Sequence, residues 1–228
     1  MIKGLQKLTL LDFPGVIAAT VFFGGCNLRC PFCHNASLVL PEKYGETISY
    51  SDFFSFLDSR RDRLQGVCVS GGEPTLYPHI EEFIRGIKDR GFLVKLDTNG
   101  TRPEVLQSLI EKKLLDYVAM DIKNSPLRYG ETVGIADFDP TPIAESAAIL
   151  MNGKTDFEFR TTVVKELHTP KDIEQIGQWL LGEEKFFLQT FVDSGDLIGT
   201  GYSGYSAPEM DELTKLLKKY IPKAQKRG

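Results

Sequence analysis

Residues 18–35 read AATVFFGGCNLRCPFCHN, a short β-prone run followed without a break by a cysteine-rich loop. Valine, threonine and phenylalanine favour a strand, and the two glycines end it. Three cysteines, Cys26, Cys30 and Cys33, then fall within eight residues. Barrel enzymes place their active-site loops directly after strands, so we expect loop 24–35 to lie at such a site.

Similar β-prone runs recur along the chain, with helix-like stretches between them. Strands are expected at residues 18–23, 66–70, 92–96, 117–122, 156–164 and 185–191, and helices at 50–64, 80–90, 103–113, 142–151 and 173–181. This alternation is typical of βα units around a parallel sheet. Six strands are too few for a closed barrel, so we predict one α/β domain over residues 1–228, a partial (βα)6 TIM-like barrel. A doubly wound sheet is the alternative.

The composition excludes several functional classes. The chain has 228 residues, of which 42% are hydrophobic and 25% charged, with a net charge of −4. It contains no apolar run of about 18 residues, the length needed to span a membrane. Its basic residues are dispersed, apart from a cluster at 215–227 that follows an expected helix, where a solvated helix end is the simplest interpretation. We therefore expect a cytoplasmic protein that binds neither membranes nor nucleic acid.

The cysteine spacing indicates metal ligation. Cys68 lies apart, in the apolar run 66–70, and is expected to be a small core residue. A structural zinc site needs a fourth ligand, and His34 directly follows Cys33, which makes joint tetrahedral binding awkward. A four-iron cluster held by three cysteines leaves one iron free to bind substrate or cofactor. A zinc knuckle or an iron–sulfur electron carrier is the alternative.

Polar residues end several of the other expected strands. Residues 70–74 read SGGEP, where two glycines let the backbone approach a ligand and Glu73 offers a carboxylate to an ammonium group. Residues 97–100 read DTNG and end the third strand. Asp121 and Lys123 end the fourth and, two residues apart, point to the same face. Taken singly, these motifs are also compatible with a tight turn, an Asx turn and a strand-end ion pair.

Two later strands and two loops complete the candidate set. Arg160 interrupts an apolar strand, and pointing into a barrel it would need an anion; an outward-facing arginine is the alternative. Gln189 lies in the last expected strand. The connection 124–139 is long enough to be a functional loop. His168, before Thr-Pro, is interpreted as an ordinary surface residue.

The Cys-x3-Cys-x-aromatic-Cys loop, with Phe32 at the aromatic position, resembles the cluster loop of the radical S-adenosylmethionine (SAM) superfamily. The resemblance implies a [4Fe-4S] cluster on Cys26, Cys30 and Cys33, and S-adenosylmethionine as the cofactor. Its methionine amino and carboxylate groups would bind the open iron. One electron would then split the sulfonium into methionine and a 5′-deoxyadenosyl radical.

The resemblance also implies roles for the strand-end residues. The Gly-Gly-Glu turn resembles the family's site for the methionine amine. The DTNG and Asp-x-Lys motifs resemble those of glycyl-radical-enzyme activases, which contact the ribose and carboxylate, and they imply a monovalent cation beside Asp97, Thr98 and Asp121. Gln189 would reach the adenine side, where related activases often have a histidine. The implied cofactor-binding residues are Phe32, Gly71, Gly72, Glu73, Asp97, Thr98, Asn99, Asp121, Lys123, Arg160 and Gln189.

Residues 4–7, 11–15 and 33–35 resemble the activating protein of anaerobic ribonucleoside-triphosphate reductase. That protein takes a hydrogen atom from a glycine of its partner and leaves a glycyl radical. Only Cys68 remains beyond the three ligands, so the electron is expected from an external flavodoxin or ferredoxin. The alternatives are an activase of another glycyl radical enzyme, of the pyruvate formate-lyase type, and a small-molecule radical enzyme.

Overall fold

The computed structural model describes residues 1–183, 185–193 and 195–228. Within these residues one eight-stranded sheet follows the order of the sequence. Its strands are β1 (Ile2–Thr9), β2 (Ala18–Phe23), β3 (Gly66–Gly71), β4 (Leu93–Thr98), β5 (Tyr117–Asp121), β6 (Asp156–Val163), β7 (Phe186–Thr190) and β8 (Gln225–Arg227). β1 pairs antiparallel with β2, and every later pair is parallel.

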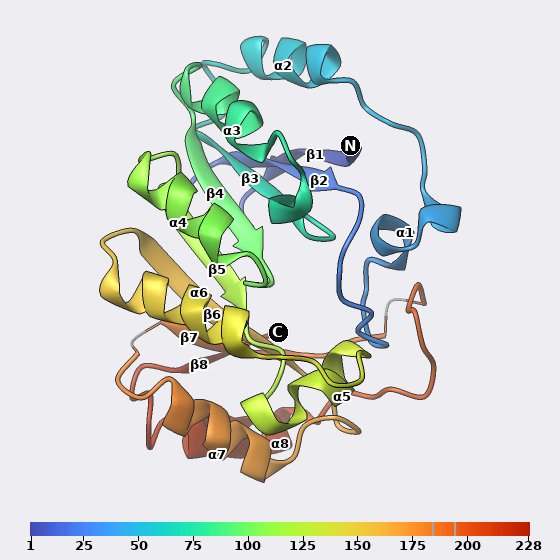
Figure 1. Cartoon of the computed structure of the whole chain (residues 1–228), viewed down its shortest axis with the longest axis vertical. Helices are drawn as coiled ribbons and strands as arrows, with labels where there is room; N and C mark the ends of the chain where they lie inside the picture. Colours follow the sequence, from blue (N-terminus) through green and yellow to red (C-terminus); the bar gives the residue numbers. More distant parts are fainter. Residues whose placement is uncertain (184, 194) are drawn as a thin grey trace.

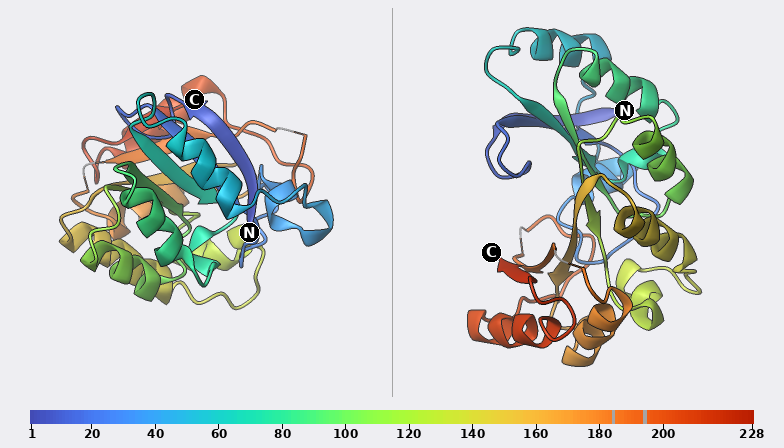
Figure 2. Two further views of the ribbon diagram at one scale, coloured as in Figure 1. Left: turned by 90° about the horizontal axis from the view of Figure 1, so that it is seen from above. Right: turned by 90° about the vertical axis from the view of Figure 1, so that its left-hand side faces the viewer.

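Most of the helices lie along the convex side of the curved sheet, as Figure 1 and the right-hand view of Figure 2 show, and the short helix at residues 36–39 lies apart from them. The α-helices are α1 (Ala36–Val39), α2 (Tyr50–Asp58), α3 (Ile80–Lys88), α4 (Pro103–Glu111), α5 (Tyr129–Val133), α6 (Thr141–Asn152), α7 (Pro170–Trp179) and α8 (Ala207–Leu217). The 3-10 helices are η1 (Pro41–Lys43), η2 (Pro74–Leu76) and η3 (Pro126–Arg128). The cysteine loop 24–35 and the strand-end motifs share the edge at which β2 to β7 end.

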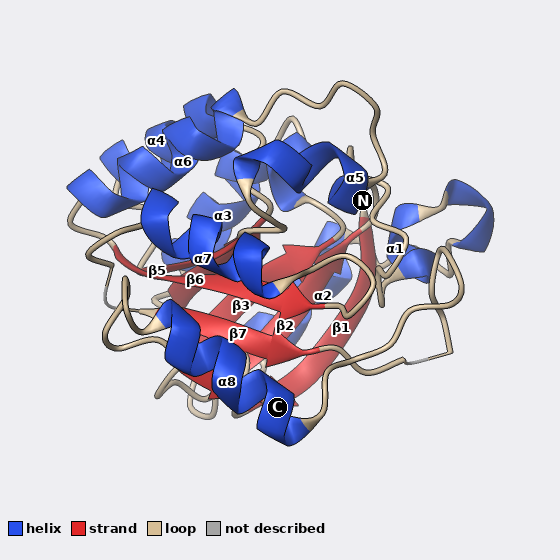
Figure 3. Ribbon diagram, turned by 90° about the horizontal axis from the view of Figure 1, so that it is seen from below, coloured by secondary structure: helices blue, strands red, loops and turns tan. Residues whose placement is uncertain are grey.

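The predicted partial barrel is confirmed. Strands β2 to β7 are the six predicted strands, and they follow one another across the sheet in sequence order. Figure 3 shows the strands gathered in the middle of the molecule with helices around them. A doubly wound sheet reverses its strand order at a switch point. This sheet has no reversal, so the doubly wound alternative is wrong.

Several local expectations were wrong. β1 and β8 extend the sheet at its two edges and were not predicted. The second helix ends at Asp58 and not near residue 64. The stretch 124–139, expected to be a loop, contains the short helices η3 and α5, and its functional role stays a prediction. The basic tail is more than a solvated helix end, since Arg227 in β8 pairs with buried Glu158 at 3.0 Å.

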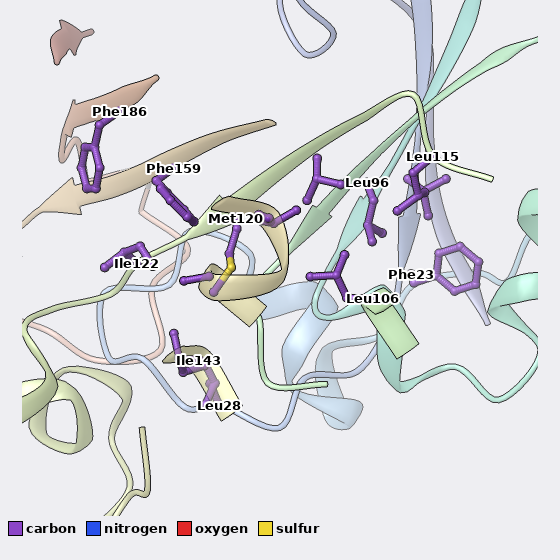
Figure 4. Packing of buried hydrophobic residues seen from close by; sticks show 14 of the residues in the cluster. Phe23, Leu28, Leu96, Leu106, Leu115, Met120, Ile122, Ile143, Phe159 and Phe186 are labelled. Atoms are coloured by element: carbon purple, nitrogen blue, oxygen red, sulfur yellow. The ribbon is translucent and has the colours of Figure 1, made fainter. Parts of the chain in front are cut away.

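The two faces of the sheet differ in polarity. Alternate residues such as Leu96, Met120, Phe159 and Phe186 are fully buried beneath the helices (Figure 4). Their neighbours along the strands point the other way, because side chains alternate across a strand. Those neighbours include Lys95 and Asp97 on β4, Asp121 on β5, and Glu158 and Arg160 on β6. The helix-facing side is therefore an apolar core, and the inside of the barrel is polar.

Candidate active site

A cavity of about 250 Å³ opens where the parallel strands end. It brings together the cysteine loop and residues from β3 to β7. Its lining residues are Cys26, Leu28, Cys30, Phe32, Cys33, His34, Asn35, Val39, Ser70, Gly71, Gly72, Asp97, Thr98, Asn99, Asp121, Lys123, Arg160, Thr162 and Gln189. Every residue predicted for the site is in this set except Glu73.

The cysteine loop is held in place by the segments around it. The Gly25 amide donates to the Leu38 carbonyl at 2.8 Å, and the Arg29 amide donates to the Val133 carbonyl at 2.9 Å. The Gly199 amide donates to the Pro31 carbonyl at 2.7 Å. These bonds tie the loop to α1, to α5 and to the segment after β7, so its position is defined by three separate parts of the chain.

His34 adds a side-chain anchor that the sequence interpretation did not assign. Its Nε2 lies 2.6 Å from the Val192 carbonyl oxygen, and its ring stacks on Phe191 with centroids 5.0 Å apart. Phe32, beside it in the loop, is buried and meets the rings of His168 and Phe191 edge-on. The aromatic residue between the last two cysteines therefore helps to pack the loop against the barrel.

Two glycines are required where β3 meets the cysteine loop. Gly71 has a φ of 131°, and a Cβ there would lie 2.2 Å from the Phe23 carbonyl oxygen. A Cβ on Gly72 would lie 2.1 Å from the Gly25 carbonyl oxygen. Both separations are far too short for real atoms. Only glycine allows the two backbones to approach this closely, which keeps the main chain of residues 71–72 exposed to the cavity.

The three loop cysteines fit an iron–sulfur cluster better than zinc. All three are free thiols on the cavity wall. Burial raises the pKa of Cys26 to about 11 and that of Cys30 to about 12, so thiolates there need a cation beside them. Over the described part of the chain, no three His, Cys, Asp or Glu side chains are gathered to hold a metal ion. A cluster instead binds each cysteine to a different iron.

Asn99 links β4 to the cysteine loop. Its side-chain amide donates to the Cys26 Sγ at 3.7 Å and to the Asn27 Oδ1 at 3.1 Å. Thr101 closes the network, because its hydroxyl donates to the Asn99 Oδ1 at 2.7 Å. Asn99 therefore contacts a predicted cluster ligand directly, and its side chain is fixed on both sides.

Glu73 is not on the cavity wall. Its side chain is buried behind the wall, where Oε1 accepts from the Thr75 amide and from the hydroxyls of Thr75 and Thr98, and Oε2 accepts from the Asn99 amide at 2.6 Å. Burial raises the pKa of this carboxyl, against the effect of the four donors. Glu73 supports the turn and Asn99 from behind, and of residues 71–73 only the two glycines line the cavity.

Charged side chains form a network on one part of the cavity wall, the charged wall. The Asp121 carboxylate accepts from Arg160 Nε and from Lys123 Nζ, each at 3.0 Å. Arg160 Nη1 also lies 3.6 Å from the Asp97 Oδ1. Burial alone would raise the pKa of Asp121, but Arg160 and Lys123 outweigh it and lower the value to about 2. Arg160 therefore points into the barrel and pairs with both aspartates, so the outward-facing alternative is wrong.

Two residues near this wall were missed or misread. Lys95, whose side chain is 1% exposed, contacts Asp97 from inside the barrel. Its spacing of two residues from Asp97 was the available signal, because such residues share a face of a strand. His168 is fully buried and not on the surface. Its Nε2 lies 2.7 Å from the Lys123 carbonyl oxygen, which fixes the chain just after β5.

The last predicted residue, Gln189, reaches the cavity from β7. It is paired in register with Thr162 of β6, which also lines the cavity. No described histidine occupies this side of the cavity wall except His34 of the cysteine loop. The folded site therefore has Gln189 where related activases often have a histidine.

Comparison with solved structures identifies the same architecture. Streptococcus suis SuiB bound to S-adenosylmethionine matches with a TM-score of 0.71 at 15% identity, over 92% of this chain and 52% of that one. The structure titled native anSMEcpe with bound AdoMet matches with a TM-score of 0.65 at 17% identity, over 87% of this chain and 58% of that one. The present chain thus spans only about half of these neighbours.

Sequence comparison covers more of the chain. A Methanocaldococcus jannaschii protein named "Putative glycyl-radical enzyme activating enzyme" is 34% identical over 97% of this chain and 93% of its own length. The pyruvate formate-lyase-activating enzyme of Staphylococcus aureus is 27% identical over 97% of this chain and 96% of its own length. The family model described as the radical SAM superfamily matches residues 20–168. Together with the three-cysteine cavity, these matches show that the chain belongs to the radical SAM superfamily, enzymes that use a [4Fe-4S] cluster and S-adenosylmethionine.

Proposed function

We propose that this protein activates a glycyl radical enzyme, and that its partner is anaerobic ribonucleoside-triphosphate reductase. The relative from Methanocaldococcus jannaschii, alike over nearly the whole chain, supports the activase class. The observation on which this proposal depends is the cavity, which is lined both by the three thiols and by charged side chains of the strand ends. We treat residues 1–228 as a single radical SAM domain, located in the cytoplasm, where thiols stay reduced.

Cys26, Cys30 and Cys33 would hold the cluster and leave one iron without a protein ligand. When bound, the cluster supplies the electron that cleaves S-adenosylmethionine and yields the hydrogen-abstracting radical. The chain's own part is to orient the cofactor and to keep water away from the radical. The loop anchors on α1, α5 and residue 199 support this, because they fix the three thiols relative to the strand ends.

The turn at residues 71–72 suits the methionine amine. Its main-chain carbonyl groups can accept from an ammonium group, and the absence of side chains allows close approach. Glu73 acts through these glycines and through Asn99, because its own carboxylate is fully engaged behind the wall. This assigns the amine contact to the backbone of Gly71 and Gly72 and gives Glu73 a supporting role.

The charged wall suits the anionic and polar parts of the cofactor. Lys123 and Arg160 line the cavity and Lys95 lies buried behind it, and together they carry three positive charges against the two negative charges of Asp97 and Asp121. One positive charge is left over, which favours a carboxylate such as that of the methionine moiety. Thr98 and Asn99 also line the cavity and would contact the ribose. Phe32 and Gln189 line other parts of it.

The choice of partner enzyme rests on short sequence motifs. The motifs at 4–7, 11–15 and 33–35 favour anaerobic ribonucleoside-triphosphate reductase. After the three ligands only Cys68 remains, and it is buried in the barrel wall, so we propose an external flavodoxin or ferredoxin as electron donor. Pyruvate formate-lyase is the second candidate partner, supported by the activating enzymes of Staphylococcus aureus and Clostridium pasteurianum among the relatives.

The test uses the reconstituted protein, reduced under anaerobic conditions with S-adenosylmethionine. It is mixed in parallel with a ribonucleoside-triphosphate reductase and a pyruvate formate-lyase, and the organic radical signal is recorded by electron paramagnetic resonance. We expect a glycyl doublet on the reductase, and none with the Cys30→Ala variant. A doublet only on the lyase would overturn the choice of partner. Cofactor cleavage without a glycyl signal on either protein would count against the activase class.

A further inference from the structure

Lys95 is the most deeply buried cation on the inner face of the described sheet. It lies in the middle of β4, its side chain is 1% exposed, and it is not part of the cavity lining. Its Nζ contacts the Asp97 Oδ1 and lies 3.8 Å from the Cys68 Sγ. Burying a lysine is costly unless it is paired, so the contact with Asp97 is what keeps the ammonium group in this place.

Every carboxylate oxygen of the two aspartates on this wall already has a side-chain partner in the protein. Asp97 Oδ1 is contacted by Lys95 and Arg160, and its Oδ2 accepts from the Cys68 thiol at 3.6 Å. Both oxygens of Asp121 are likewise taken, by Arg160 and Lys123. All four carboxylate oxygens are therefore engaged by side chains of the protein.

Thr98 is engaged as well. Its hydroxyl donates to the Glu73 Oε1 at 2.9 Å and accepts from the Gly100 amide at 3.1 Å. A metal cation needs several oxygen ligands, and the residues expected to supply them already have partners. With Lys95 included behind the wall, three positive charges face the two carboxylates, so an added cation would also be repelled. The residues beside Asp97 and Asp121 do not fit a monovalent metal ion.

We propose that the Lys95 ammonium group supplies the positive charge expected beside Asp97 from a monovalent metal ion, so that the protein binds S-adenosylmethionine without such an ion. Lys95 is then a positioning residue, because it acts on the cofactor through Asp97. This inference rests on the cavity being the cofactor site, and it is independent of the partner enzyme. The raised pKa of Lys95 agrees with it: burial lowers the value, and Asp97 together with Cys68 outweighs that effect.

The first test needs no variant. Binding of labelled S-adenosylmethionine to the cluster-bearing protein is measured by equilibrium dialysis in sodium, potassium or tetramethylammonium chloride at one ionic strength. Tetramethylammonium is too large to enter a metal site. We expect the dissociation constant to stay within about twofold across the three salts, since no exchangeable ion takes part. A wild-type protein that binds well only in sodium or potassium would overturn the proposal.

Two substitutions distinguish the effect of the Lys95 charge from the effect of the space that its side chain fills. Lys95→Ala removes the ammonium group and opens room for an ion, whereas Lys95→Met removes the charge but fills the space. In tetramethylammonium both variants should bind S-adenosylmethionine about tenfold more weakly or worse, because Asp97 is left with less compensation. Sodium or potassium should restore binding to Lys95→Ala only. A purely structural role for Lys95 would not produce this ion-dependent rescue.

Lys215→Ala, which alters an exposed lysine of α8, is the matched control and should behave as wild type in every salt. Circular dichroism establishes that each variant is folded. A folded Lys95→Ala protein that no ion rescues, or one that binds as wild type in tetramethylammonium, would overturn the proposal. Absence of S-adenosylmethionine binding by the wild type in every salt would refute the cofactor site itself, and this inference with it.

Discussion

The side-chain amide of Asn99 donates a hydrogen bond to the Cys26 sulfur across 3.7 Å, between the end of β4 and the cysteine loop. Hydrogen bonds to cluster sulfurs stabilise the more negative, reduced state and raise the reduction potential. This residue therefore offers a direct way to adjust the proposed cluster without touching its ligands.

Asn99→Ala should lower the cluster's reduction potential while leaving the cluster assembled. One lost hydrogen bond of about 1 kcal/mol corresponds to roughly 40 mV for a one-electron couple. A redox titration followed by electron paramagnetic resonance measures the shift. Thr101→Val, which alters the network without removing the donor to sulfur, is the control. An unchanged potential in Asn99→Ala would show that this contact does not act on the cluster.

The cluster assignment separates the four cysteines into two classes. Cys30→Ala should abolish the brown colour, the bound iron and all cleavage of S-adenosylmethionine. Cys68→Ala should retain all three, because Cys68 lies within the barrel and its loss should cost roughly 1 kcal/mol of stability. Iron and sulfide analysis after anaerobic reconstitution makes the comparison. Full iron content in Cys30→Ala would refute the assignment.

Because residues 71–72 approach the cysteine loop so closely, we expect a side chain added there to disturb cluster assembly. Gly72→Ala places a methyl group against the Gly25 carbonyl and should displace the loop, so less cluster should assemble. Gly45→Ala is a matched control, because a Cβ there meets nothing within 4 Å. Iron content per folded chain is the measurement. Equal loading of both variants would mean that the loop tolerates displacement.

Glu73 should matter for stability more than for direct cofactor contact. Glu73→Ala leaves the amides of Thr75 and Asn99 without their acceptor, so we expect a loss of about 2–4 kcal/mol in the free energy of unfolding. Urea denaturation measures it, with the exposed Glu82→Ala as control. A Glu73→Ala protein of normal stability that fails to bind S-adenosylmethionine would instead place the carboxylate in the cofactor site.

Asp121 predicts a specific acid sensitivity. Its pKa is about 2 in the folded chain against an ordinary value of 3.8, so folding favours the ionised form. The resulting stability, about 2 kcal/mol, is fully present above pH 4 and is lost as the pH falls towards 2. Urea unfolding between pH 6 and pH 3 should show a shallower pH dependence for Asp121→Asn. Asp62→Asn, on an exposed turn, should retain the wild-type dependence.

The sequence predicted those features that depend on strong local patterns. The six parallel strands follow from their apolar and β-branched runs, and the cysteine spacing identifies the loop. β1 was missed because its residues, IKGLQKLT, show little apolar alternation and are partly exposed at a sheet edge. β8 has only three residues, QKR, and its pairing with β7 depends on tertiary contact.

Side-chain direction was the harder part of the site. The carboxylate of Glu73 turns away from the cavity because its neighbours Thr75 and Asn99 offer it donors, and no sequence pattern reports that choice. Lys95 was not assigned from the sequence, although Asp97, two residues later on the same face of the strand, was available as its partner. His168 precedes a helix-starting Thr-Pro, yet tertiary packing buries it completely against Lys123.

The sheet's two outer strands, β1 and β8, pair only with their inner neighbours among the described strands. A small change in sheet twist can therefore widen or narrow the half-barrel without breaking hydrogen bonds between its strands. A fully closed barrel would resist the same deformation, because each of its strands is hydrogen-bonded to a neighbour on both sides. The fold thus combines a rigid site at the strand ends with a sheet whose curvature can change.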